Sequence, residues 1–246
     1  MSLSEALDRS GNWLFRWRAV PPLLALVLLM LHLRGYQHLF GSRLADDAWQ
    51  AGCLLVASAG LALRACVVGH TPKDTSGRNA REQRAASLNT SGLYSVVRHP
   101  LYLGNFLIYL GTVAFTHDPW PAAVCLLGYW LYYVPIMHAE ESFLRARFGT
   151  GFDEWARRTP AIVPALHGWA PPSLPFSLRN VLRREYNNVF SVLLAMFLLD
   201  AASESAARGH LALGPAWSLV LAAGFIAWLV LRTLKRHTEV LRVAGR

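Results

Sequence analysis

Arg98 and His99, whose side chains can bind an anion or take part in proton transfer, precede Pro100 at the point where a basic, polar stretch gives way to an apolar one. Proline lacks an amide hydrogen and has a fixed φ angle, so we expect a helix to begin at Pro100. The free N–H groups of its first turn and the positive end of the helix dipole would face whatever lies beside His99. Such a place suits an anionic group, for example a carboxylate or a phosphate. A membrane helix without a catalytic role would begin in the same way.

Two glutamates, Glu140 and Glu141, close a later apolar segment. A carboxylate at the edge of a membrane span costs free energy unless it is paired or hydrated, so it indicates a functional site. The alternative is a simple polar end to the span, because the cost is lower at the membrane edge. The apolar segments 101–117 and 119–139 are joined by a short turn, so we expect an antiparallel hairpin. This hairpin places both glutamates on the same membrane face as His99.

Long apolar blocks classify the chain as an integral membrane protein. Hydrophobic residues make up 54% of its 246 residues, whereas an ordinary soluble domain has roughly 45–50%. The predicted fold is an all-α, polytopic membrane bundle of about six transmembrane helices, each needing roughly 20 residues to cross the hydrocarbon core. The predicted spans cover residues 17–39, 48–68, 101–117, 119–139, 187–203 and 211–232. Residues 178–186 are predicted to form an interfacial amphipathic helix.

The net charge of +9 would suit nucleic acid, but the basic residues cluster at the ends of spans rather than in a separate domain. That pattern is typical of a membrane protein that faces anionic lipid. Loop 69–100 carries five basic residues against two acidic ones, and the tail 232–246 carries five against one. Positive loops stay in the cytoplasm, so we expect both termini and the basic loops on that side. The predicted partner is therefore a membrane lipid and not a nucleic acid.

The three cysteines, Cys53, Cys66 and Cys125, lie in or beside apolar blocks without CxxC spacing. They indicate neither a disulfide framework nor a zinc site, so no metal site is predicted. The first apolar block has no small-x-small cleavage site after it, and we interpret it as a retained span.

Arg78, Arg81 and Arg84 recur every three residues in the polar loop 69–91, so even a short helix would place them on one face. Arginine binds phosphate through two parallel N–H bonds, which would make these side chains a clamp for an anionic headgroup. The same arginines would also serve as a positive anchor against lipid headgroups on the cytoplasmic side. Both interpretations stay open.

The motif Gly92-Leu-Tyr94-x-x-x-Arg98-His99-Pro100-x-Tyr102-x-Gly104 is followed by Glu140-Glu141, Phe148-Gly149 and a tail from Trp155 to Pro164. This combination resembles the isoprenylcysteine carboxyl methyltransferase and phospholipid methyltransferase superfamily over about residues 50–165. Members are integral-membrane enzymes that use S-adenosyl-L-methionine without a Rossmann domain. The resemblance implies a cofactor site on the cytoplasmic face. The implied cofactor-binding residues are His99, Pro100, Tyr102, Gly104, Asn105, Glu140 and Glu141.

These residue types suit that cofactor. The start of the helix at Pro100 would receive its carboxylate, and glutamates would bind its ammonium or its ribose hydroxyls. The aromatic faces of Tyr102, Tyr133 and Trp155 would favour the sulfonium. Family members often have tyrosines where this chain has Phe152 and Trp155, which leaves hydroxyl roles at those positions open.

The resemblance divides the chain into three segments. Residues 1–47 form an N-terminal transmembrane helix and loop, and residues 48–165 form the methyltransferase core. Residues 166–246 contain the interfacial helix and two C-terminal transmembrane helices, which lie outside the common core and would reshape lipid access.

The basic loop indicates an anionic acceptor, because an ammonium headgroup would be repelled. A phosphate or a carboxylate is already ionised at neutral pH, so methyl transfer to it needs alignment rather than a general base. The residues Thr71–Asn79 and Leu88–Thr90 resemble the bacterial branch that O-methylates the 1-phosphate of lipid A, which implies a bacterial inner-membrane location. We assign catalysis to Arg98, His99 and Glu141, and substrate binding to Arg78, Arg81, Arg84, Arg98 and Tyr133.

Two alternatives remain besides O-methylation of an anionic lipid headgroup. The chain would be a phosphatidylethanolamine N-methyltransferase or an isoprenylcysteine-type carboxyl methyltransferase, the former needing a carboxylate near the acceptor to remove a proton. The last alternative is a non-catalytic membrane scaffold. Against this interpretation, the chain keeps the motif residues intact, namely His99, Pro100, Glu140 and Glu141.

Overall fold

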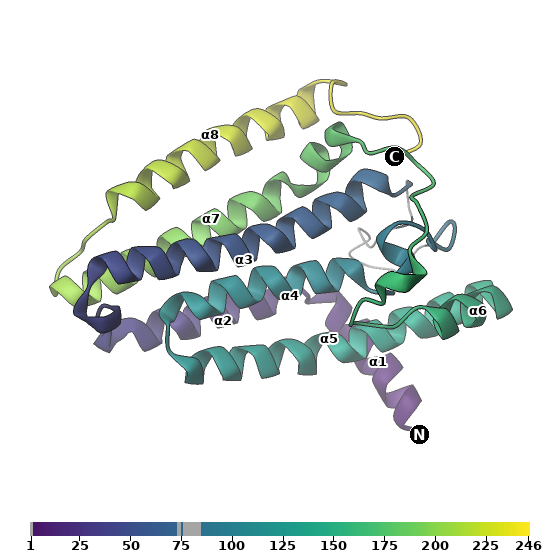
Figure 1. The fold of residues 1–246 in the computed structure, drawn as a ribbon, viewed down its shortest axis with the longest axis horizontal. Helices are drawn as coiled ribbons and strands as arrows, with labels where there is room; N and C mark the ends of the chain where they lie inside the picture. The colour runs from purple at the N-terminus through teal and green to yellow at the C-terminus, as the bar shows by residue number, and fades with distance from the viewer. Residues whose placement is uncertain (1, 73–74, 76–84) are drawn as a thin grey trace.

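Helices and short 3₁₀ turns, with no β-strand, make up the regular structure of the described part of the chain, which covers residues 2–72, 75 and 85–246 of a computed structural model. The all-α prediction is therefore confirmed. The α-helices are α1 (Leu3–Arg16), α2 (Val20–His32), α3 (Arg43–His70), α4 (Pro100–Val113), α5 (Pro119–Phe148), α6 (Thr150–Arg158), α7 (Leu178–Arg208) and α8 (Pro215–His237). Figure 1 shows α4 between α3 and α5, with α8 on the outer side of α7.

Each predicted span corresponds to a helix, but the number six is not confirmed. The helices α3, α5, α7 and α8 are long and apolar enough to cross a membrane, and α1 and α2 together form a fifth candidate that bends by 71° at its break. The apolar helix over residues 100–116, which is α4 with its final 3₁₀ turn, is shorter. It packs against α2, α3, α5 and α7, so its place inside the bundle does not depend on its length.

One boundary differs from the prediction at the C-terminal part of the chain. The interfacial helix expected at 178–186 and the span expected at 187–203 are one continuous helix, α7. Ser177 caps its start by accepting a hydrogen bond from the N–H of Asn180, and Gly209 ends it in the left-handed conformation. No proline or glycine lies between these two residues, so nothing in the sequence interrupts the helix where polar residues give way to apolar ones.

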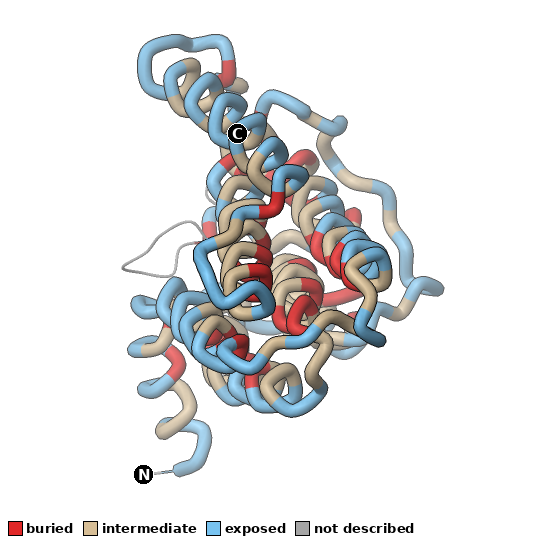
Figure 2. The backbone as a smooth tube through the Cα atoms, turned by 90° about the vertical axis from the view of Figure 1, so that its left-hand side faces the viewer, coloured by how far each residue is buried: buried red, intermediate tan, exposed pale blue. Residues whose placement is uncertain are grey.

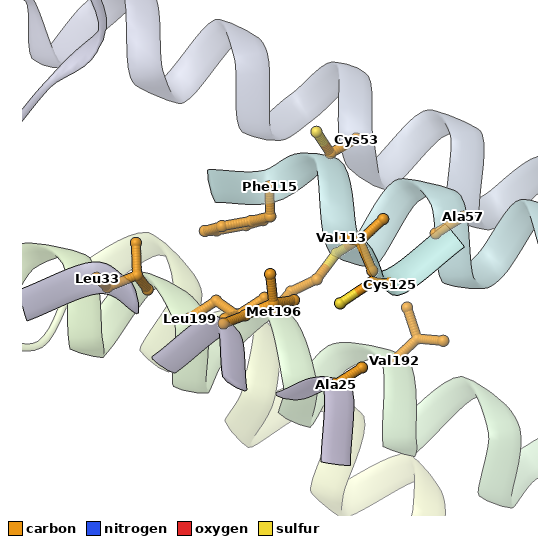
Figure 3. Packing of buried hydrophobic residues seen from close by; sticks show 11 residues of the cluster. Ala25, Leu33, Cys53, Ala57, Val113, Phe115, Cys125, Val192, Met196 and Leu199 are labelled. Atoms are coloured by element: carbon orange, nitrogen blue, oxygen red, sulfur yellow. The ribbon is translucent and has the colours of Figure 1, made fainter. Parts of the chain in front are cut away.

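The core lies where α2, α3, α4, α5 and α7 meet. Figure 2 shows the buried positions on the inward sides of these helices. Side chains from separate helices pack together in Figure 3, and Val113, Met196 and Leu199 are fully buried there. Because lipid is as apolar as leucine, close packing between helices stabilises such a bundle more than burial of apolar surface does.

Glycines bring α4 close to α3 at the centre of the bundle. A side chain at Gly60 would lie 2.5 Å from the carbonyl oxygen of Gly104 and 2.8 Å from the backbone nitrogen of Ile108. A side chain at Gly104 would lie 2.6 Å from Cγ of Arg64. Such small residues allow two backbones to approach in a membrane protein. This approach fixes α4 against α3.

The first residues of α4, the last turns of α5, the start of α7 and both chain termini lie toward one end of the molecule in Figure 1. The turn between α4 and α5 lies at the opposite end, where the carboxylate of Asp118 accepts a hydrogen bond from the N–H of Trp120 and caps α5. The expected hairpin of the two helices is therefore present.

We predict that Gly60→Ala destabilises the protein by about 1–3 kcal/mol, because the new methyl group meets backbone atoms that cannot move aside. Gly52→Ala in the same helix is the matched control, since no other atom lies within 4 Å of the added carbon. Thermal unfolding of the detergent-solubilised variants measures the difference. Equal midpoints for the two variants would contradict the close approach of α3 and α4.

Candidate functional site

A backbone brace holds the loop that leads into α4. The N–H of Arg98 donates to the carbonyl of Pro160 at 2.8 Å, and the N–H of His99 donates to that of Ala161 at 3.3 Å. The indole N–H of Trp155 donates to the carbonyl of Tyr94 at 2.9 Å. The segment after α6 therefore fixes the position at which α4 begins.

The brace also changes the prediction about the start of α4. The helix begins at Pro100 as expected, with His99 as its N-cap. The N–H of His99 is already bonded to the brace, and the first bond within α4 is donated by Leu103 to the carbonyl of His99 at 3.0 Å. Only the N–H groups of Leu101 and Tyr102 precede that bond, and they are the ones a ligand would meet.

The structure brings together the three residues predicted to be catalytic. Nη1 of Arg98 lies 2.8 Å from Oε2 of Glu141, and Nε2 of His99 lies 2.9 Å from Oε1 of the same carboxylate. His99 is buried, and the other two side chains are mostly buried. This ion-paired joint ties the start of α4 to the last turns of α5. Both carboxylate oxygens of Glu141 are engaged in it.

Glu140 has a different environment. Its Oε2 is buried and has no hydrogen-bond partner among the described residues, and Nδ1 of His99 is 3.8 Å away. A buried carboxylate oxygen without a donor is unfavourable. This atom is therefore suited to a ligand that brings a positive charge or a hydroxyl group.

Glu140 lines a cavity of about 780 Å³, to which α1, α2, α3, α4, α5 and α7 contribute residues. The size is that of a small-molecule site. Its wall is apolar toward α2 and the middle of α7 and polar toward the start of α4. The polar and charged side chains of that end are Arg18, Arg64, Tyr94, Arg98, His99, Asn105, Glu140, Arg184, Glu185 and Asn188.

A second, mostly buried ion pair lines the same cavity, on the α3 and α7 sides. Arg64 of α3 binds Glu185 of α7 through two contacts of 2.8 and 3.0 Å, and it also donates to Oδ1 of Asn105 in α4 at 2.6 Å. Asn188 donates to Glu185 at 2.7 Å. Parallel N–H bonds of this kind fix both position and orientation. The pair therefore joins three helices around the cavity.

Tyr94 also lines the cavity. Burial and the negative charge of Glu140 raise the pKa of Tyr94 above its ordinary value, while the positive charges of Arg184 and Arg64 act in the opposite direction. The phenol therefore stays protonated at neutral pH. It can donate a hydrogen bond to a ligand but does not act as a base.

The remaining predicted site residues fall into three groups. Pro100, Tyr102, Asn105 and Tyr133 line the cavity, and the hydroxyl of Tyr133 is held near the bend between α1 and α2 by the carbonyl of Arg18 at 3.4 Å. Gly104 faces α3 instead and does not line the cavity, because its lack of a side chain serves helix packing. The predicted phosphate clamp lies outside the described residues, namely at Arg78, Arg81 and Arg84.

Two aromatic positions at which the expected role was open are structural. Phe152 is fully buried, and Trp155 donates its N–H to the backbone of Tyr94. Neither lines the cavity. Among the described residues, no group of three or more His, Cys, Asp or Glu side chains could hold a metal ion.

Sequence reasoning did not identify Arg64, Arg184, Glu185 and Asn188. The position of Arg64 could have indicated a buried ion pair, because an arginine inside an apolar span costs free energy unless it has a partner within the bundle. Its partner is 121 residues away, on a helix that was expected to lie at the membrane surface. The position of that helix is a property of the tertiary fold.

Comparisons with known proteins agree with the family resemblance. The family model described as phospholipid methyltransferase matches residues 51–151. The cobalt-zinc-cadmium resistance protein CzcN of Cupriavidus metallidurans is 37% identical over 67% of this chain and 70% of its own length. No solved structure matches the chain.

Two further relatives show the breadth of the similarity. The nickel-cobalt-cadmium resistance protein NccN of Alcaligenes xylosoxydans xylosoxydans is 33% identical over 61% of this chain, and the chain spans 63% of that relative's length. Protein-S-isoprenylcysteine O-methyltransferase B of Arabidopsis thaliana is 31% identical over 34% of this chain and 43% of its own length.

We predict that Glu141→Ala lowers the free energy of unfolding by about 1–3 kcal/mol, because the mostly buried side chains of Arg98 and His99 lose their shared partner. Glu154→Ala is the control, since Glu154 is exposed on α6. Denaturation in detergent, followed by tryptophan fluorescence, measures both. A loss in Glu141→Ala no larger than in Glu154→Ala would contradict a structural role for the joint.

Proposed function

Since the chain belongs to the superfamily of membrane methyltransferases that contains the phospholipid and isoprenylcysteine methyltransferases, we propose that it O-methylates an anionic lipid headgroup with S-adenosyl-L-methionine as the methyl donor. The best-supported acceptor is a phosphate, of which the 1-phosphate of lipid A is one example. Family membership supports the reaction class. The choice of acceptor rests on the cavity.

The observation that carries the proposal is the separation of charge within one cavity. Glu140 presents an unpaired carboxylate oxygen on the α5 side, while Arg184 and the Arg64–Glu185 ion pair lie on the α7 and α3 sides, where two guanidinium groups outnumber one carboxylate. Tyr94 is within electrostatic reach of both. A cationic methyl donor is favoured on the α5 side and an anionic acceptor on the α3 and α7 sides. Their opposite charges would hold the two reactants side by side, which is the main requirement for a displacement at carbon.

The residues at the start of α4 fit the cofactor. When bound, S-adenosyl-L-methionine supplies an electrophilic methyl group on a sulfonium. Glu140 would bind its ammonium or a ribose hydroxyl through the buried Oε2. The N–H groups of Leu101 and Tyr102 would bind its carboxylate at the positive end of α4. Tyr102 and Tyr133, whose ring centroids are 5.4 Å apart in the cavity wall, would favour the positive charge.

The apolar part of the cavity supports a lipid as the acceptor. Leu26 of α2 and Leu198 of α7 line it, as do Leu23 and Ser191, which are also exposed at the surface of the bundle. The cavity therefore reaches the molecular surface along apolar helices, from which an acyl or prenyl chain would enter. The positive-inside distribution of charge supports a cytoplasmic position for the polar end. The corresponding location is the bacterial inner membrane.

A charge argument connects this reaction with the names of two relatives. A phosphate monoester carries close to two negative charges at neutral pH. One O-methylation removes one of them, and the headgroup then binds divalent cations less strongly. Lipid methylation would in this way lower the affinity of a membrane surface for divalent metal ions. Such ions appear in the names of two relatives, the nickel-cobalt-cadmium and the cobalt-zinc-cadmium resistance protein.

One observation favours a second candidate, N-methylation of an ethanolamine headgroup. An ammonium acceptor must lose a proton before it reacts, and Glu140 is a carboxylate in the cavity without a hydrogen-bond donor on Oε2. The arginines on the α3 and α7 sides would repel that headgroup. The two candidates differ in the atom that receives the methyl group.

We predict that membranes containing the protein transfer label from methyl-labelled S-adenosyl-L-methionine into a phosphate-bearing lipid, identified by mass spectrometry of the lipid extract. Glu140→Gln should lower transfer at least about 100-fold, the order of magnitude of losing one charge-assisted contact to a positively charged ligand in a buried site. Because Glu140 is outside the ion-paired joint, the variant should unfold at the wild-type temperature.

Each other result decides between the alternatives. Label in methylated ethanolamine lipids would replace the O-methylation proposal by the second candidate. Label in a prenylated cysteine would indicate carboxyl methylation. If no species is labelled and the purified protein does not bind S-adenosyl-L-homocysteine, the methyltransferase proposal is wrong. The non-catalytic scaffold is then the alternative that remains.

A further inference from the structure

We propose that α7 is the acceptor-recognition element of the protein and that Arg184 is its anion-binding residue. The ligand class is an amphiphile with a phosphate monoester or another anionic oxygen group at the head of a long apolar chain. The proposal deepens the function argued above and rests on it. It concerns residues that the family-model match, residues 51–151, does not include.

Five of the α7 residues that line the cavity form a regular stripe. Arg184, Asn188, Ser191, Ala195 and Leu198 recur at intervals of four, three, four and three residues, and all five line the cavity. This spacing places them on one face of a helix. A single face of α7 therefore forms one side of the cavity from the polar end to the apolar end.

The stripe changes chemistry along its length. Its first three members are polar, and the next two are an alanine and a leucine. At a rise of 1.5 Å per residue, the stripe from residue 184 to residue 198 is about 21 Å long. A ligand lying along it would meet hydrogen-bond donors at one end and a hydrocarbon surface at the other. That gradient matches an amphiphile better than a small polar metabolite.

Arg184 stands at the head of this stripe. It lines the same polar end of the cavity as Glu140, and its positive charge reaches Tyr94. Arg64 of α3 lines the same end, where Glu185 and Asn105 hold its side chain in place. Arg184 is the arginine of α7 whose side chain lines the cavity, whereas Arg183 does not line it. A guanidinium in such a position can bind a phosphate through two N–H bonds.

The Arg64–Glu185 ion pair fixes the position of the polar end of the stripe, which recognition of a headgroup requires. Glu185 follows Arg184 in the chain and is buried, with Arg64 on one side and Asn188 on the other. Because Asn105 of α4 also binds Arg64, the pair connects the head of the stripe to the helix that carries the predicted cofactor residues. The head of the stripe is thereby held at a fixed place relative to His99.

The first experiment measures binding of a defined anionic lipid, dioleoyl phosphatidic acid, to the purified wild-type protein and to Arg184→Gln. Dioleoyl phosphatidylcholine has the same chains without the exposed phosphate monoester and serves as the reference lipid. We expect Arg184→Gln to weaken binding of phosphatidic acid about tenfold or more and to leave binding of phosphatidylcholine unchanged. Inorganic phosphate added as competitor shows whether the headgroup alone is recognised.

Arg183→Gln is the matched control. It removes the same charge from the neighbouring position of the same helix, outside the cavity. We expect it to bind phosphatidic acid within about twofold of wild type, because its charge does not line the cavity. Arg184→Lys keeps the charge but loses the planar fork, so its binding should be intermediate. Thermal unfolding and binding of S-adenosyl-L-homocysteine should be unchanged in all three variants.

The outcomes separate this proposal from the proposed function. If Arg184→Gln and Arg183→Gln weaken binding equally, or neither does, Arg184 is not the recognition residue even if methyl transfer occurs. If Arg184→Gln alone weakens binding but no lipid is methylated, the anion site stands and the proposed reaction is wrong. If Arg184→Gln does not fold, the Arg184→Lys variant decides, because phosphatidic acid binding equal to wild type would contradict phosphate recognition by the guanidinium fork.

Discussion

The ion-paired joint formed by Arg98, His99 and Glu141 determines where the other groups of the site lie. It connects the start of α4 to the last turns of α5 at contacts of 2.8 and 2.9 Å. The joint fixes the direction in which the neighbouring Glu140 faces. It also orients Tyr102, which lies one turn into α4. Paired charges that are mostly shielded from water lose their stabilising effect when one partner is removed, so the geometry of the cavity depends on all three side chains.

A second, mostly buried ion pair positions further helices around the same cavity. Arg64 and Glu185 join α3 to α7, and Asn105 brings α4 into the same network. A charge inside an apolar bundle must find its partner there, which makes the register between these helices specific in a way that apolar contacts alone do not. The glycines between α3 and α4 act together with this pair, because the side chain of Arg64 lies against Gly104. Packing and electrostatics therefore define the same arrangement.

The sequence predicted local features well and long-range contacts only in part. The helix start at Pro100 is confirmed because proline restricts its own backbone, and the return of Glu141 to His99 follows from a short turn between two apolar helices. The continuity of α7 was missed because a change from polar to apolar residues looks like a boundary, although nothing there breaks a helix. The Arg64–Glu185 contact joins residues 121 positions apart. Periodicity shows which face of a helix is buried but not which helix covers it.

The two adjacent glutamates show how one residue type acquires two roles. Glu141 has both oxygens engaged by Arg98 and His99, whereas Glu140 keeps one buried oxygen without a donor among the described residues. An unsatisfied buried polar atom costs roughly 1–3 kcal/mol, and a side chain that only ended a helix would avoid this cost by turning toward water. Glu140 is held in the cavity wall by its place beside the joint. A ligand with a positive charge or a hydroxyl group would recover that free energy on binding. Glu140 is therefore available to bind a ligand, whereas Glu141 stabilises the fold.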